Sequence, residues 1–294
     1  MKYNYFDNLP AIKLPKQATT LNQKVWHYIP ETVPEKLFIG KIWKTCGASD
    51  VTRLETVLPK GTVEIVFNFS DGISFRKFGE KTSSPLPSVF VNGLNFSPVH
   101  VSLPKGQHYF GLQLHPCALP SLFDLTLEEC NNQILGKEVI CKSLNHLTEQ
   151  LSETHNFLMQ VNLVLNWLDK KLSECYLDMD IYRRILSLHL NQNIIHLSVR
   201  KLGEDYSLSE RHLRRLCRHF LGLSPEKLIL YKKYLAALKC LHQSGQKLTA
   251  VGLECGFYDQ SHFIRTFRLF TGMTPGNYIV KKGIIPGHIF EIPH

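Results

Sequence analysis

The sequence predicts an α+β protein, with an antiparallel β-rich barrel or sandwich followed by an all-α domain. Two observations support this: short alternating apolar runs bounded by turn residues up to about residue 142, and apolar residues at three- and four-residue steps beyond it. The chain has 294 residues, which is enough for two hydrophobic cores. We therefore expect a β-rich domain, a helical connector, a helical domain with two similar units and a tail, at residues 1–142, 143–180, 181–282 and 283–294.

Six short runs of β-branched and aromatic residues predict the strands of the N-terminal domain. In the third run, Val63 and every second residue after it are apolar, so one face should be buried, while Glu64 and Asn68 lie on the opposite face. If that second face lines a barrel interior, the two polar residues could orient a ligand. If it is the outer face, they are solvated, and we favour the outer position. The six runs are Leu37–Trp43, Arg53–Leu58, Thr62–Phe69, Ser88–Val91, Val99–Leu103 and Tyr109–Leu114.

The connector contains a long amphipathic helix. From Leu158 to Leu172, apolar residues recur at three- and four-residue steps, and a charged run lies opposite this apolar face. Two interpretations remain open: the apolar face packs on its own domain, or it forms a dimer or interdomain contact.

Charge separates the two halves of the chain. The whole sequence has 34 Lys and Arg against 25 Asp and Glu, a net charge of +9, while residues 181–294 have 17 basic and 7 acidic residues. All the excess positive charge therefore lies in the C-terminal region, which favours a polyanion as its partner, with a solvated basic surface as the alternative. No apolar run approaches the about 18 residues of a membrane span, and the N-terminus lacks the apolar core of a secretory signal. We expect a cytoplasmic protein that does not bind a membrane.

An internal repeat occupies the C-terminal region. Residues 209–228 and 259–278 align at a constant offset of 50, and many positions are identical or similar. The aligned pairs include Ser209/Asp259, His212/His262, Leu213/Phe263, Arg215/Arg265, Arg218/Arg268, Gly222/Gly272, Ser224/Thr274 and Pro225/Pro275. The two segments are therefore copies of one supersecondary unit.

Each copy has the start and stop signals of a capped helix. Ser209 and Asp259 are suited to the N-cap, and Gly222 and Gly272 are suited to a left-handed residue at the C-terminal end. Short helices at 197–205 and 248–255 precede the two copies, each separated from its copy by a tight turn. A short helix, a turn and a second capped helix predict a helix-turn-helix, so we expect recognition helices at about 209–220 and 259–270.

The exposed faces of these two helices carry basic and amide side chains. Arg can contact guanine and Gln can contact adenine through paired hydrogen bonds, while other basic groups neutralise phosphate. A rigid helix within Pro225–His242 could hold the two recognition helices about one DNA turn apart, roughly 34 Å. The residues expected to contact base edges are Arg211, Arg214, Arg215, Gln260, Ser261, His262 and Arg265, with Arg218 and Arg268 nearer phosphate.

Residues from about 181 to 281 resemble the DNA-binding domain of the AraC/XylS family of bacterial transcription regulators. In the second unit the matching positions are Gly256-Phe257, Asp259, Ser261, Phe263, Arg265, Phe267, Gly272, Thr274-Pro275 and Tyr278. In the first they are Ser209, Arg211, Leu213, Arg215, Gly222, Ser224 and Pro225, and Ala237 matches the alanine of the linker helix. The chain departs from the family pattern at Gly203, Gly252, Cys217, Lys233 and Ile264, none of which removes the basic face.

The N-terminal half resembles the sensor-like β domain that often precedes this DNA-binding domain, through residues 58–69 and 110–116. The resemblance implies a transcription regulator that binds promoter sites on double-stranded DNA, with a domain for an effector or for dimerisation. Its expected partners also include RNA polymerase, a small-molecule effector of unknown identity and a second copy of the chain.

Two other functions remain as alternatives to a DNA-binding transcription regulator. A cupin-like metal-dependent enzyme would use His100, His108 and His115, but no H-x-H pair with a downstream Glu and His is present. The other is a ligand-binding protein whose basic domain no longer binds DNA specifically. No phosphate-binding loop, nucleophile elbow or C-x-x-C pair occurs, so we expect neither catalysis nor a cofactor.

Overall fold

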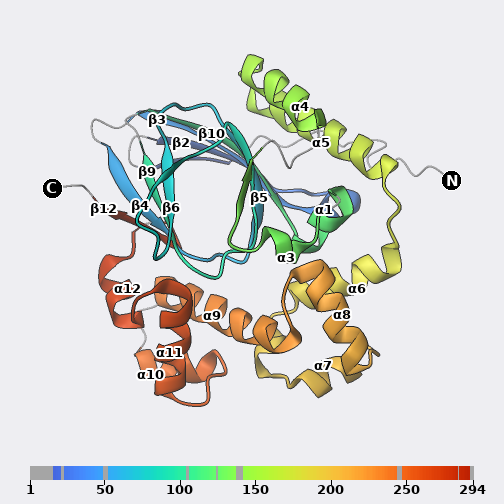
Figure 1. The fold of residues 1–294 in the computed structure, drawn as a ribbon, viewed down its shortest axis with the longest axis vertical. Helices are drawn as coiled ribbons and strands as arrows, with labels where there is room; N and C mark the ends of the chain where they lie inside the picture. The colour runs from blue at the N-terminus through green and yellow to red at the C-terminus, as the bar shows by residue number, and fades with distance from the viewer. Residues whose placement is uncertain are drawn as a thin grey trace.

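The computed structural model describes residues 16–20, 23–48, 52–103, 106–123, 125–136, 142–243, 247–283 and 285–291. Figure 1 shows a β-barrel stacked on a layer of helices, with two further helices covering the far side of the barrel. The predicted α+β class is confirmed: antiparallel strands come first and the helix-turn-helix helices follow. Residues 1–15, on which the expectation about a secretory signal rests, lie outside the described part. None of the described helices is both long and apolar enough to cross a membrane.

Two antiparallel sheets form the barrel. The larger has the strand order β1-β2-β3-β10-β5-β8-β11, and the smaller has the order β12-β4-β9-β6-β7. The strands of the larger sheet are β1 Lys16–Thr20, β2 Gln23–Tyr28, β3 Ile39–Ala48, β10 Gly106–Leu114, β5 Val63–Asn68, β8 Val89–Asn92 and β11 Ile134–Gly136. Those of the smaller sheet are β12 His288–Glu291, β4 Arg53–Val57, β9 Val99–Leu103, β6 Ser74–Lys77 and β7 Ser84–Pro85.

The helices fall into three groups. Short helices at the end of the barrel are α1 Val33–Phe38, η1 Pro116–Ala118, α2 Leu119–Leu122 and α3 Leu127–Cys130. The connector contains α4 Lys142–Glu153, α5 Phe157–Glu174 and α6 Met179–Leu190. The remaining helices are η2 Asn193–His196, α7 Val199–Asp205, α8 Glu210–Leu221, α9 Pro225–Gln243, α10 Leu248–Glu254, α11 Gln260–Thr271 and α12 Pro275–Lys281.

The first predicted strand begins later than expected, because residues 33–38 form helix α1. Thr32 caps this helix by accepting a hydrogen bond from the Glu35 amide, and a proline lies in its first turn. The Glu35 carboxylate is fully buried and accepts a hydrogen bond of 2.5 Å from the Tyr28 hydroxyl. Local capping and this tertiary contact outweigh the β-type composition of residues 37 and 38.

Strand β5 is buried on both faces, so the favoured solvated position for Glu64 and Asn68 is wrong. Both side chains are less than a tenth exposed. Glu64 lies on the cavity side of the barrel, where one carboxylate oxygen accepts hydrogen bonds from Trp43 (3.2 Å) and Gln113 (3.4 Å). Val63, Ile65 and Phe67 on one face of β5 are buried in the core, and Glu64 and Val66 on the other face line the cavity, so the strand has no solvent face. Donors on β3 and β10 make the buried carboxylate tolerable.

The apolar face of the connector helix packs on its own chain. In α5 the side chains of Val161, Leu165, Leu168 and Leu172 are buried in the same core as the barrel. Lys44 on β3 donates hydrogen bonds to Gln160 (3.0 Å) and to the backbone carbonyl of His155 (3.2 Å), which holds α5 to the larger sheet. This face is therefore unavailable for a dimer contact.

The segment expected to be a tail contains a strand. Strand β12 follows the last helix of the second unit, pairs with β4 and completes the smaller sheet of the barrel. Its Ile289 side chain is buried, and the imidazole of its His288 forms a hydrogen bond with the carboxylate of Glu55. The C-terminal end of the helical region is therefore attached to the N-terminal domain.

Candidate nucleic-acid interface

The two repeat units have the predicted capped second helices. The side-chain oxygen of Ser209 accepts a hydrogen bond from the His212 amide at 3.3 Å, and that of Asp259 accepts one from the His262 amide at 2.6 Å. Gly222 and Gly272 end the helices with φ of +64° and +70°. The expected recognition helices therefore correspond to α8 and α11, within one residue at each end.

Glycine allows the helices of each unit to cross closely. A Cβ atom on Gly203 would lie 2.8 Å from the backbone oxygen of Leu208, and one on Gly252 would lie 3.2 Å from the ring of Phe263. These are the two positions where the family pattern has alanine. Helix α7 can therefore pack tightly against the turn that leads to α8, and α10 can pack tightly against α11 itself.

Helix α8 presents a basic face beside the N-terminal domain. Its arginines line an open cleft together with Thr126 and Glu128, which lie at the start of α3. The sequence missed these two residues, because nothing local links the barrel end to a helix more than 80 residues later. The basic residues that line the cleft are Arg211, Arg214, Arg215, Arg218 and His219.

Arg214 is held differently from the other expected base contacts. Its guanidinium lies 2.5 Å from a carboxylate oxygen of Glu226, at the start of α9, and 3.7 Å from Glu210. The hydrogen bond with Glu226 raises the pKa of Arg214 above its already high value. In this geometry Arg214 links α8 to α9.

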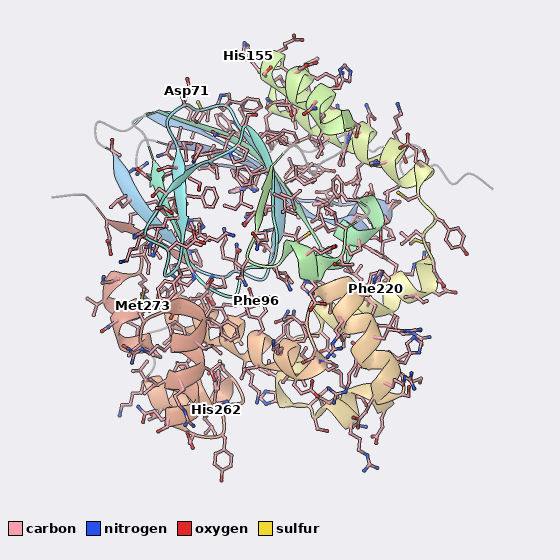
Figure 2. All side chains as sticks on the ribbon, viewed as in Figure 1. Asp71, Phe96, His155, Phe220, His262 and Met273 are labelled. Atoms are coloured by element: carbon pink, nitrogen blue, oxygen red, sulfur yellow. The ribbon has the colours of Figure 1, made fainter. Side chains whose placement is uncertain are left out.

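Helix α11 exposes Gln260, Ser261, Arg265 and Arg268. His262 is only partly exposed, and its ring packs edge-on against Phe257 at a centroid distance of 5.5 Å. Figure 2 places His262 on the side of the molecule that faces away from the barrel. The second unit thus offers a polar helix face to a ligand outside the molecule.

Two residues near the second unit were not singled out as site residues. Tyr258, in the turn before α11, is 91% exposed and adjoins the N-cap. Lys233 of α9 donates a hydrogen bond of 2.6 Å to the backbone oxygen of Gly256, and burial lowers the pKa of this lysine. In the sequence, only the presence of an aromatic residue in the turn before the helix could have pointed to Tyr258. Lys233 was recognisable only as a departure from the family pattern.

Helix α9 joins the two units. Its 19 residues span about 28 Å at roughly 1.5 Å per residue, which is somewhat less than the roughly 34 Å of one DNA turn. The ring of Tyr234 packs against Phe267 and Phe270 of α11 at centroid distances of 5.7 and 4.8 Å. Helix α9 therefore packs into the core of the second unit.

The three histidines of the enzyme alternative do not converge. His100 contacts Thr56, His108 packs against Phe69, and His115 contacts the backbone oxygen of Lys36. Across the described ranges, no group of three or more His, Cys, Asp or Glu side chains could hold a metal ion.

The barrel encloses a second candidate site, a cavity of about 220 Å³. Four aromatic side chains line it, and Glu64, Lys60 and His288 are among its polar residues. The indole of Trp43 lies against Gly111, where a Cβ atom would come within 2.1 Å of the ring. The aromatic residues are Trp43, Phe90, Tyr109 and Phe290.

Comparison with known proteins finds two separate family matches along the chain. Residues 202–280 match a family described as a helix-turn-helix domain, and residues 36–136 match a domain of unknown function (DUF6597). The probable transcriptional regulator LumQ of Photobacterium leiognathi is 28% identical over 173 residues, which are 59% of this chain and 63% of LumQ. The transcriptional activator RhaS of Pectobacterium atrosepticum is 31% identical over 74 residues, which are 25% of this chain and 26% of RhaS.

Among solved structures, ToxT from Vibrio cholerae covers 81% of this chain and 97% of its own, with 12% identity and a TM-score of 0.44. The chain spans less than two thirds of the length of the first curated relatives it matches. Two capped units joined by one helix, with a family match over both, define a double helix-turn-helix protein. The family match over residues 202–280 and the RhaS relatives support an AraC/XylS-type helix-turn-helix domain in this chain.

Proposed function

We propose that the protein is a sequence-specific, DNA-binding transcription regulator, and that α8 and α11 enter successive major grooves. Helix-turn-helix domains of this type bind double-stranded DNA. The observation that carries the proposal is the pair of equivalent helices with exposed basic and amide side chains, joined by a single helix of 19 residues. Arg211, Arg215, Gln260, Ser261, His262 and Arg265 would contact base edges, with Arg214 beside them and Arg218 and Arg268 near phosphate.

The test is selection of bound duplexes from a random DNA pool, with the full chain at about 150 mM salt. We expect a motif of two blocks about one helical turn apart. The comparison is the chain with Arg215→Ala and Arg265→Ala, which should bind more weakly and lose the preference at the base pairs that these residues contact. Binding without any motif, lost as salt rises, would leave only nonspecific affinity for polyanions and would contradict the proposal.

A small-molecule effector in the barrel cavity is the second part of the proposal. The cavity is mostly apolar with a few polar groups, which is typical of ligand sites. A panel of metabolites screened by thermal unfolding should contain a compound that raises Tm. Val101→Trp would fill the cavity and abolish that rise, whereas Val33→Trp, at an exposed position, would leave it unchanged. A rise that survives Val101→Trp would place the ligand elsewhere.

RNA polymerase and a second copy of the chain are the remaining proposed partners. Because the apolar face of α5 is buried, a dimer would have to use another surface. Exposed Leu269 at the end of α11 and Val280 in α12 are available to a protein partner. Sedimentation of the full chain tests the dimer directly.

A further inference from the structure

The barrel touches the first repeat unit at the end of its recognition helix. The side-chain amide of Asn131, directly after α3, donates a hydrogen bond of 2.8 Å to the backbone oxygen of Gly222. A Cβ atom on Gly222 would lie 2.6 Å from the same Asn131 nitrogen. The N-terminal domain therefore supplies a partner for a terminal carbonyl of α8, a group that has no partner within its own helix.

The barrel touches the second unit at the equivalent position, 50 residues later. A Cβ atom on Gly272 would lie 2.7 Å from ring atoms Cε2 and Cζ of Phe78, just after β6. The Phe78 ring is also near the ring of His100, at a centroid distance of 6.3 Å. The C-terminal glycine of α11 is thus in contact with an aromatic side chain of the smaller sheet.

Barrel loops also form hydrogen bonds with α9, the helix that joins the two units. The hydroxyl of Tyr231 donates to the Asn95 carbonyl at 2.8 Å and accepts from the Gly61 amide at 3.0 Å. The hydroxyl of Tyr234 donates to the Pro59 carbonyl at 2.9 Å. The N-terminal domain therefore holds the linker helix between the two recognition helices.

These contacts lie at the ends of α8 and α11 and on α9, while the arginines of α8 line the open cleft beside α3. Figure 2 places Phe220 and Met273, near the ends of α8 and α11, on the side toward the barrel, and His262, near the start of α11, on the far side. The expected base contacts Arg211, Arg265 and Gln260 lie in the first half of their helices and are exposed.

We propose that the barrel is a brace that sets the distance and relative rotation of α8 and α11, with Asn131 and Phe78 as positioning residues. This inference rests on the proposed function. Each base pair inserted between two binding blocks moves the second block by about 3.4 Å and rotates it by roughly 35°. A braced pair of helices cannot follow that movement without losing barrel contacts, whereas a pair held by one linker helix can adapt by bending it.

The test compares the full wild-type chain with the double variant Phe78→Ala, Asn131→Ala. Fluorescence anisotropy would measure affinity for three duplexes: the selected motif, the same motif with two added base pairs between its blocks, and one block alone. We expect the insertion to weaken the wild type at least roughly tenfold, and the double variant by at most about threefold. Affinity for one block should be the same in both proteins, because neither residue faces DNA.

The matched control is Met159→Ala, Asn162→Ala, at exposed positions on α5, which lies across the barrel from the recognition helices (Figure 1). It should keep the wild-type spacing preference. Phe78 is half exposed and Asn131 is not in the core, so the double variant should unfold within a few degrees of the wild type.

An unchanged spacing preference in the double variant would overturn the brace. Tighter binding of the double variant to all three duplexes would also overturn it, because the barrel contacts would then be inhibitory. A wild type that selects no motif would remove the proposed function itself, and the inference with it.

Discussion

At the scale of single residues, the two recognition helices carry arginines in different settings. Arg265 is exposed in the first half of α11, Arg268 lies one turn later, and Arg214 is paired with Glu226. From the sequence we expect Arg214 to contact base edges, as for Arg211 and Arg215. Only the fold brings the start of α9 beside it, since the two residues are separated by a turn and a helix end.

Arg265→Ala should weaken binding to the selected motif by about 1–3 kcal/mol and relax the preference at one base pair, because a two-bond contact to guanine would be lost. The measurement is affinity for the motif and for its single-base variants. Arg268→Ala is the matched comparison: it should weaken all sequences equally and reduce the salt slope by about one. Equal loss on every sequence for Arg265→Ala would move that residue to the phosphates.

Glu128→Gln should strengthen DNA binding roughly two- to threefold at low salt, with the gain disappearing as salt rises. The carboxylate lies in the cleft beside four arginines of α8, so it would repel a phosphate that approaches them. Glu149→Gln, an exposed position on α4, is the control and should have no effect. A gain of the same size in the control would reflect net charge alone.

At the scale of elements, the repeat explains why both recognition helices begin and end where they do. Each has an oxygen-bearing N-cap, a left-handed glycine at its end and a proline in the next helix. These are local signals, so the sequence located the helices within one residue.

Gly222→Ala should lower the free energy of unfolding by about 1–2 kcal/mol, because alanine is strained at φ +64° and its Cβ would collide with the Asn131 amide. Gly276→Ala is the control: this glycine lies in the first turn of α12, and a Cβ there meets nothing closer than 4.0 Å. That change should be neutral or slightly stabilising. Urea unfolding of both variants measures the difference, and equal losses would contradict the role of the C-terminal glycine.

At the scale of the whole molecule, the barrel and the helices share an interface that contains ionisable groups. His115 follows β10, His189 lies in the last turn of α6, and Lys232 of α9 donates a hydrogen bond to the His189 carbonyl. Burial, then the nearby charges of Lys232 and His115, lower the pKa of His189 well below its ordinary value of 6.5. Burial likewise lowers the pKa of Lys232 to about 8.

We expect this interface to lower the free energy of unfolding at acidic pH. Below about pH 6.5 the unfolded chain binds a proton at His189 that the folded chain does not, so the free energy of unfolding falls as the pH falls. His189→Phe should therefore lose less stability than the wild type between pH 7 and 5.5. The control, His146→Gln, lies at an exposed position on α4 and should follow the wild type. Parallel curves for His189→Phe and the wild type would show that this histidine does not contribute.

The sequence by itself determined the α+β class, the β-type runs and both helix-turn-helix units, because alternation, apolar spacing and capping act over a few residues. The tertiary structure decided the rest. Glu64 is a buried cavity residue because β5 lies between β10 and β8 in the larger sheet, with its other face in the core. The segment expected to be a tail contains strand β12, which pairs with β4. The contacts of Asn131 and Phe78 with two equivalent glycines join segments far apart in the chain. Such contacts depend on how the domains pack, and no local pattern encodes that packing.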